Sequence, residues 1–253
     1  NNRLHLAYSF ELLGPIFSAS HIRKTVEHFF NIAPQGIPCW SFSNHDVIRH
    51  VSRWAAHGSS PEALAKQTAA LLLSLEGSIC LFQGEELGQL ETEMEFSELT
   101  DPLGIRFWPE NKGRDGCRTP MSWDSNLENA GFSEVDPWLP VKKPQLERAV
   151  EQQKNKDSVL SFYREMLKFR KNSSALSGGR TVFYDSDEPV LSFSRQSDDQ
   201  NVVCVFNLSK EEVSLQIEGL KDIKNHPFLE AKADGEVLSL GPNGFCFFFA
   251  DLD

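Results

Sequence analysis

The sequence predicts an α/β fold for residues 1–177, followed by a small antiparallel β domain in residues 178–253. Two observations support this division. Up to residue 86, short apolar runs alternate with segments of helical periodicity, an order that predicts parallel strands with helices packed outside them. After Gly178-Gly179 the pattern changes to short β-rich runs separated by turn residues. At 253 residues the chain is long enough to form more than one domain.

Three strands and two helices are expected in the first 86 residues. Ser20 is a candidate N-cap for a helix with one apolar face, and Ser60-Pro61 is a strong start signal for a second helix. Each strand is followed by polar residues. The expected strands are residues 4–10, a buried run that ends before Asn44, and residues 79–82; the expected helices are residues 21–30 and 63–75.

The segment 87–141 has no clear periodicity, although it is rich in aromatic residues. A long irregular segment inside a compact protein is usually functional, so we expect it to form one wall of an active site. An amphipathic helix is then expected to open at Asn155-Lys156-Asp157-Ser158. The residues expected on its inward face are Val159, Phe162, Tyr163, Met166, Leu167 and Phe169.

The β-rich runs after residue 178 are short and are bounded by clusters of Ser, Asp, Asn and Gly, as in an antiparallel domain. The expected strands are residues 181–184, 190–193, 202–206, 213–217 and 245–249.

Composition excludes several classes of partner. The formal net charge of -11 argues against nucleic acid and against an anionic membrane surface, and it is compatible with a neutral, polyhydroxylated ligand. The longest apolar runs are too short to span a bilayer. The five cysteines are widely spaced and contain no CxxC pair, so we expect reduced structural thiols and a cytoplasmic location.

Asn44, His45 and Asp46 are the first candidate functional residues, because they crowd polar groups at the carboxyl end of a buried strand. In barrels of alternating strands and helices, chemistry is done at that end. An aspartate beside a histidine can bind adjacent sugar hydroxyls, orient a nucleophile or ligate a metal. A structural role, in which these side chains cap the next helix, is equally compatible with the local sequence. No partner residues have the spacing of a metal site.

A second cluster lies in residues 113–124, where Arg114 and Arg118 are interleaved with aspartates. Arginine suits a site that must fix a carboxylate by a two-pronged hydrogen bond, although such a segment is also typical of a solvated loop. Glu85 and Glu86 at the end of the third strand are acid/base candidates, but such a pair more often makes structural ion pairs.

These residues resemble a known family. The stretch from Phe42 to Asp46, followed by Arg49, resembles the signature at the seventh barrel strand of glycoside hydrolase family 13, the α-amylase family. Further stretches are similar to its oligo-1,6-glucosidase and α-glucosidase branch. These stretches are residues 83–88, 113–124, 129–133, 155–158 and 167–171.

The resemblance implies strands six to eight of a (β/α)8 TIM barrel, followed by a small antiparallel β-sandwich domain. It implies that Asp46 stabilises the transition state and that His45, Asn44, Arg49 and Arg114 bind substrate. His45 and Asp46 would hydrogen-bond the C2 and C3 hydroxyls of the reacting glucose, and Arg114 would pair with Asp46. Such contacts strengthen as an oxocarbenium-like transition state forms.

The implied activity is that of a retaining α-glucosidase acting on oligosaccharides or sucrose-like substrates. Two alternatives remain: a transglycosylating relative of the sucrose isomerase type, and a non-catalytic scaffold such as a transporter heavy chain. In the family, the nucleophile and the general acid lie at the ends of strands four and five, which would precede Asn1. We therefore expect an inactive fragment that associates with itself or with the missing N-terminal half. No cofactor is expected, and any calcium site would lie in that missing half.

Overall fold

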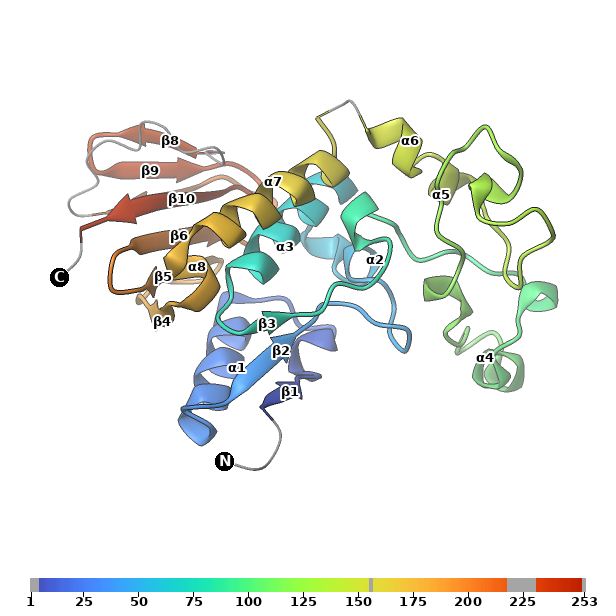
Figure 1. Cartoon of the computed structure of the whole chain (residues 1–253), viewed down its shortest axis with the longest axis horizontal. Coiled ribbons are helices and arrows are strands. Elements are labelled where there is room, and N and C mark those ends of the chain that lie inside the picture. The colour runs from blue at the N-terminus through green and yellow to red at the C-terminus, as the bar shows by residue number, and fades with distance from the viewer. Residues whose placement is uncertain (1–4, 155–156, 218–230, 252–253) are drawn as a thin grey trace.

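The computed structural model describes residues 5–154, 157–217 and 231–251. Leu4, the first residue of the first predicted strand, lies outside the described residues, as do Asn155 and Lys156, the first two residues of the predicted helix start. The first part contains a three-stranded parallel sheet in the order β1-β2-β3, as the alternating pattern predicts (Figure 1). The strands are shorter than expected, and the last hydrogen bond between β2 and β3 is donated by the Cys80 N–H to the Trp40 carbonyl at 2.9 Å. The strands are β1 (Leu6–Tyr8), β2 (Ile37–Trp40) and β3 (Ser78–Ile79).

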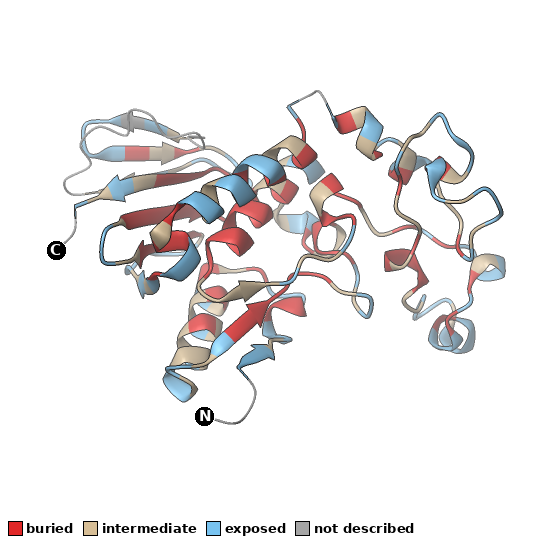
Figure 2. Ribbon diagram, in the orientation of Figure 1, coloured by how far each residue is buried: buried red, intermediate tan, exposed pale blue. Residues whose placement is uncertain are grey.

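Helices α1 (Ala19–Ile32) and α3 (Pro61–Ser74) share one hydrophobic cluster with Trp40, while Ile79 packs against that cluster. Helix α3 begins as predicted, because the Ser60 hydroxyl accepts the Ala63 N–H at 3.1 Å. It is buried over most of its surface (Figure 2). The predicted cap of α1 is wrong: Ser18, not Ser20, accepts the N–H of His21.

Helix α7 (Val159–Asn172) lies alongside α3 (Figure 1). Its cap is Ser158, which accepts the Ser161 N–H. The predicted inward face is partly wrong, because Leu167 is 42% exposed whereas Leu160 is buried. The remaining helices are short: α2 (His50–Arg53), α4 (Pro102–Phe107), α5 (Lys143–Leu146), α6 (Val150–Gln153) and α8 (Ser174–Gly178).

The segment 87–141 forms an irregular excursion at the end of the molecule opposite the C-terminal sheets (Figure 1). It holds α4 and several single 3₁₀ turns, including Asp115–Cys117. A small hydrophobic cluster of its own, made by Met94, Leu99 and Leu139 with Trp108 packed against it, gives the excursion a local core.

Two antiparallel sheets make up the C-terminal part, in the orders β10-β6-β5-β4 and β7-β9-β8. Strands β8 and β9 were not predicted: they form a hairpin around Gly235, which has a φ of +60°. The strands are β4 (Arg180–Phe183), β5 (Val190–Gln196), β6 (Asn201–Asn207), β7 (Val213–Gln216), β8 (Ala231–Asp234), β9 (Val237–Leu240) and β10 (Phe245–Ala250).

The two parts share their main core. Phe193, Phe206 and Phe245 of the four-stranded sheet belong to the same hydrophobic cluster as the buried residues of α3. Phe245 also meets Phe162 of α7 edge to face, with 5.7 Å between ring centroids. At the surface, Glu188 accepts the N–H groups of the first two residues of α1 at 3.1 and 2.8 Å. The β part is thus packed tightly onto the helices that flank the parallel sheet.

Candidate active site

Asn44, His45 and Asp46 lie just beyond the carboxyl end of β2. The Asn44 Oδ1 accepts the Asp46 N–H at 2.9 Å, which closes a tight turn, while its Nδ2 donates to the Tyr8 hydroxyl at 3.4 Å. Ser43, the residue before them, accepts the His50 N–H at 2.8 Å. Because β1 ends at Tyr8, this turn is tied to the edge of the sheet where two strands finish.

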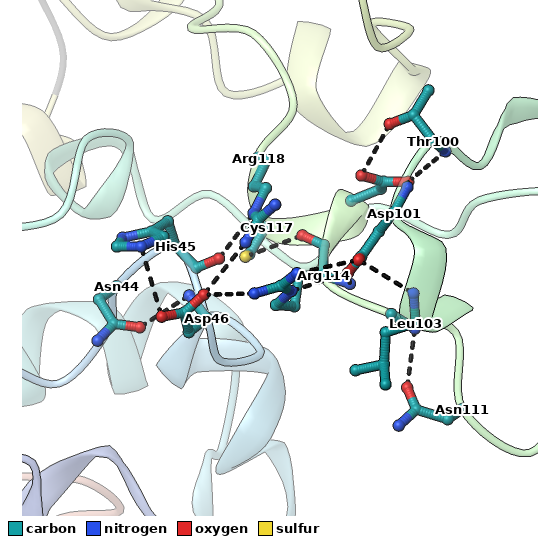
Figure 3. Close-up of polar contacts among 12 residues, drawn as sticks. Asn44, His45, Asp46, Thr100, Asp101, Leu103, Asn111, Arg114, Cys117 and Arg118 are labelled. Carbon is teal, nitrogen blue, oxygen red and sulfur yellow. Dashed lines mark hydrogen bonds and ion pairs between the residues drawn. The ribbon is translucent and has the colours of Figure 1, made fainter. Parts of the chain in front are cut away.

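Asp46 is held between two arginines (Figure 3). Its Oδ1 accepts from Arg114 Nη1 at 3.0 Å and from Arg118 Nη2 at 3.1 Å. Its Oδ2 lies 3.4 Å from His45 Nε2. The side chain of Asp46 remains 47% exposed, so the ion-paired carboxylate still faces solvent.

Arg114 reaches Asp46 from a two-pronged ion pair with Asp101. Arg114 Nε donates to Asp101 Oδ2 at 2.8 Å, and Nη2 donates to Oδ1 at 3.0 Å. This pairing holds the pKa of Asp101 well below, and the pKa of Arg114 well above, their ordinary values. The side chain of Asp101 is fully buried.

The structure places Arg49 away from the exposed carboxylate. It is buried, and its guanidinium donates to the carbonyls of Gln83 at 2.8 Å and Cys117 at 2.9 Å. Burial lowers its pKa. Arg49 therefore joins the loop after β3 to the loop that carries the two arginines, and its side chain does not open onto the site.

The sequence did not predict the contact of Arg118 with Asp46 or that of Asp101 with Arg114. Arg114 and Arg118 flank the 3₁₀ turn Asp115–Cys117, and both guanidinium groups reach Asp46 Oδ1. Asp101 carries no distinctive sequence signal, because Asp-Pro before a short helix is also an ordinary helix cap, and its Oδ1 does accept the Leu103 N–H.

Within residues 5–154, 157–217 and 231–251, no three His, Cys, Asp or Glu side chains gather closely enough to hold a metal ion. In the same residues, no helix is both long and apolar enough to cross a bilayer. The site instead presents an ion-paired carboxylate, a histidine and two guanidinium groups. Such a set can accept hydrogen bonds from, and donate them to, a polyhydroxylated molecule.

Comparison with known proteins identifies the family of the chain. The family profile described as "Alpha amylase, catalytic domain" matches residues 5–179. A probable alpha-glucosidase of Rhizobium meliloti (strain 1021) is 43% identical over 240 residues, covering 93% of this chain and 43% of that protein. An oligo-1,6-glucosidase of Heyndrickxia coagulans is 32% identical over 206 residues, covering 73% of this chain and 37% of that protein.

Solved structures agree. The alpha-glucosyl transfer enzyme XgtA has a TM-score of 0.92 and 44% identity, over 98% of this chain and 47% of that one. The trehalulose synthase MutB from Pseudomonas mesoacidophila MX-45 has a TM-score of 0.82 and 25% identity, over 97% and 51%. The chain thus spans about half the length of these relatives, or less. It belongs to the alpha-amylase family, glycoside hydrolase family 13, with β1, β2 and β3 as strands six to eight of a (β/α)8 barrel followed by an antiparallel β-sandwich.

Proposed function

We propose that this chain is the sugar-holding part of an enzyme that acts on terminal α-linked glucose with retention at the anomeric carbon. The observation that carries the proposal is the position of Asp46, half exposed between Arg114 and Arg118 at the end of β2. Relatives named alpha-glucosidase and oligo-1,6-glucosidase support the substrate class.

In this proposal Asp46 and His45 accept and donate hydrogen bonds to the C2 and C3 hydroxyls of the glucose. A carboxylate at that place is useful because its hydrogen bonds strengthen as positive charge develops on the sugar ring in the transition state. Arg114 holds Asp46, Asn44 shapes the turn that presents it, and Arg49 contributes by joining the loops behind the site.

A retaining glycosidase also needs a nucleophile and a general acid on either side of the bond. We assign both to strands four and five of the family barrel, outside residues 1–253. The isolated chain then holds a sugar without cutting it. Its physiological partner is the N-terminal half of the barrel, and its proposed location is cytoplasmic, with residues 1–177 contributing to the barrel and residues 178–253 forming the β domain.

Glucosyl transfer is the second candidate, since the structures of an alpha-glucosyl transfer enzyme and of a trehalulose synthase superpose on nearly the whole chain. In both reactions the sugar is held in the same way, and they differ in the group that accepts the glucosyl unit. A non-catalytic scaffold is disfavoured because a scaffold has no physical need for the assembled Asp46, Arg114 and Arg118 cluster.

The test uses the full-length protein that carries this chain. It should release 4-nitrophenol from 4-nitrophenyl α-glucoside, and NMR should show the α-anomer of glucose first. Asp46→Asn should lower kcat/KM by about 100-fold or more, because the amide accepts weaker hydrogen bonds from the transition state. Asp185→Asn, on a side chain that is 99% exposed in the β domain, is the matched control and should leave the rate unchanged.

An unaffected rate in Asp46→Asn contradicts the assignment of Asp46. Glucose as the main product of sucrose or maltose supports hydrolysis, whereas new disaccharides support transfer. No turnover of any α-glucoside by the full-length protein contradicts both enzymatic readings.

A further inference from the structure

The buried carboxylates of the excursion form a chain of contacts that ends at Asp46. The chain starts at Asp115, which is fully buried. Asp115 Oδ2 accepts the N–H groups of Thr100 at 2.7 Å and of Asp101 at 2.8 Å, and its Oδ1 accepts the Thr100 hydroxyl at 3.1 Å. These three hydrogen bonds fix the backbone at Asp101, the residue that pairs with Arg114.

Asp101 in turn fixes both ends of Arg114. Its Oδ2 accepts the main-chain N–H of Arg114 at 2.8 Å as well as the side-chain Nε, and its Oδ1 accepts Nη2. The guanidinium is planar and its donors have a rigid fork geometry. When Nε and Nη2 are held by one carboxylate, the direction of the remaining Nη1 is set, and that direction leads to Asp46 Oδ1 at 3.0 Å.

We propose that Asp101 is a positioning residue for Asp46, acting through Arg114, with Asp115 as its support. This inference rests on the proposed function, since it extends the sugar-holding role of Asp46 to a carboxylate that no sugar touches. A half-exposed arginine without such a partner samples many rotamers. The two hydrogen bonds to the buried carboxylate of Asp101 remove that freedom, so Arg114 contacts the carboxylate of Asp46 in one geometry.

The decisive experiment is a double-mutant cycle in the full-length protein. Asp101→Asn replaces one carboxylate oxygen by an NH2 group, which cannot accept a hydrogen bond from the guanidinium. It therefore breaks the two-pronged pairing while the volume of the side chain stays nearly the same. We expect it to lower kcat/KM for 4-nitrophenyl α-glucoside by about tenfold or more, chiefly through kcat, since the contact matters most in the transition state. The double variant with Arg114→Ala should lose no more than Arg114→Ala alone, because both changes remove the same contact.

The proposal is overturned if the loss of kcat/KM in the double variant equals the product of the two single losses, because Asp101 then acts independently of Arg114. Arg114→Lys gives a second reading: it keeps the charge but not the fork, and combining it with Asp101→Asn should cost nothing more. Glu98→Gln is the matched control. It removes another loop carboxylate that is ion-paired, to Lys142 at 2.6 Å, and we expect unchanged kinetics.

A crystal structure of Asp101→Asn provides a readout that does not need activity. Arg114 Nη1 should leave Asp46 while the backbone of the excursion stays in place. An Arg114 that still donates to Asp46 in that structure overturns the proposal. If the wild-type protein shows no turnover, the proposed function is contradicted. The crystal structure then still tests whether Asp101 positions Arg114 against Asp46.

Discussion

At the scale of single residues, Asp46 uses one carboxylate oxygen for both arginines. Oδ1 accepts from Arg114 and Arg118, while Oδ2 has only the His45 ring, 3.4 Å away, among its described ion-pair partners. The two oxygens therefore differ: Oδ1 carries both arginine contacts, whereas Oδ2 keeps more of its capacity to accept hydrogen bonds. In the proposed function, Oδ2 is the oxygen that accepts a sugar hydroxyl.

The ion pair of Asp101 also predicts a pH dependence of stability. Arg114 lowers the pKa of Asp101 below its unfolded value of 3.8, so the ionised carboxylate stabilises the folded state. That stabilisation is present in full well above pH 3.8 and is lost as the pH falls through the lower, folded-state pKa. Asp101→Asn should therefore lower Tm at pH 7, and the difference from wild type should shrink steadily in acid. A Tm difference that is the same at every pH contradicts this expectation.

The sequence predicted Asn44, His45, Asp46 and Arg114 because they stand in recognisable local patterns. Arg49 stands in the same pattern, but its contacts are with the carbonyls of Gln83 and Cys117, far along the chain. The neighbours of a residue in sequence indicate its place after a strand, whereas the loops that pack over it decide whether its side chain is exposed to solvent. That second factor is invisible in a local pattern, and it is also why Asp101 was missed.

At the scale of elements, the start of α1 shows how a tertiary partner selects one of two local solutions. Ser18 and Ser20 are both good caps. Glu188, from the β part, accepts the N–H groups of Ala19 and Ser20, which makes these the first residues of the helix and leaves Ser18 as its cap. Ser60, in contrast, was predicted correctly, because Pro61 after it marks the first helical position.

Glu188→Gln should destabilise the protein by about 1 kcal/mol, since the amide loses the negative charge at the helix N-terminus and one of two acceptor oxygens. Urea unfolding measures this as a lower midpoint at constant slope. Asp185→Asn is the matched control, because Asp185 pairs with Arg23 of the same helix at 2.9 Å through a side chain that is 99% exposed. Equal losses in the two variants contradict the capping role of Glu188.

The hairpin of β8 and β9 was missed for a different reason. Its sequence contains Lys232, Asp234 and Glu236 and has few β-branched or aromatic residues, so its local propensity for strand is weak. The hairpin forms because Leu238 and Leu240 are buried against the other sheet, in the cluster with Val203 and Val205. Packing from outside the segment overrides its weak propensity.

At the scale of the whole molecule, one face of the parallel sheet is covered and the other is open. Trp40 and Ile79 point toward the helices, so their neighbours Cys39 and Cys80 point to the opposite face, because side chains alternate along a strand. On that face Ile37 is 44% exposed, and Leu6, its partner on β1, is 43% exposed. This is the face that a complete barrel encloses, and we propose that the N-terminal half of the barrel packs there.

Cys80 offers a direct measure of that packing. It is the exposed cysteine of the five, whereas Cys39, Cys117, Cys204 and Cys246 are buried, and burial raises the pKa of the Cys117 and Cys246 thiols to about 12. A maleimide should therefore modify one thiol quickly in the folded chain, and Cys80→Ser should abolish that reaction. Adding the N-terminal half of the barrel should protect Cys80.

Light scattering on the chain alone completes this test. Because the open face and the edge of β1 are apolar, we expect association at micromolar concentration. A clean monomer whose Cys80 reacts at the same rate with and without the N-terminal half contradicts the proposed docking face.

The contacts that hold Asp46 all come from one uninterrupted stretch of the chain, from Asn44 to Arg118. The proposed bond-cutting carboxylates come from strands that precede β1. If the proposed function holds, recombination between two family members ahead of β1 transfers the sugar-binding residues from one parent and the nucleophile and general acid from the other. Such an exchange, natural or engineered, breaks no contact within either group of residues.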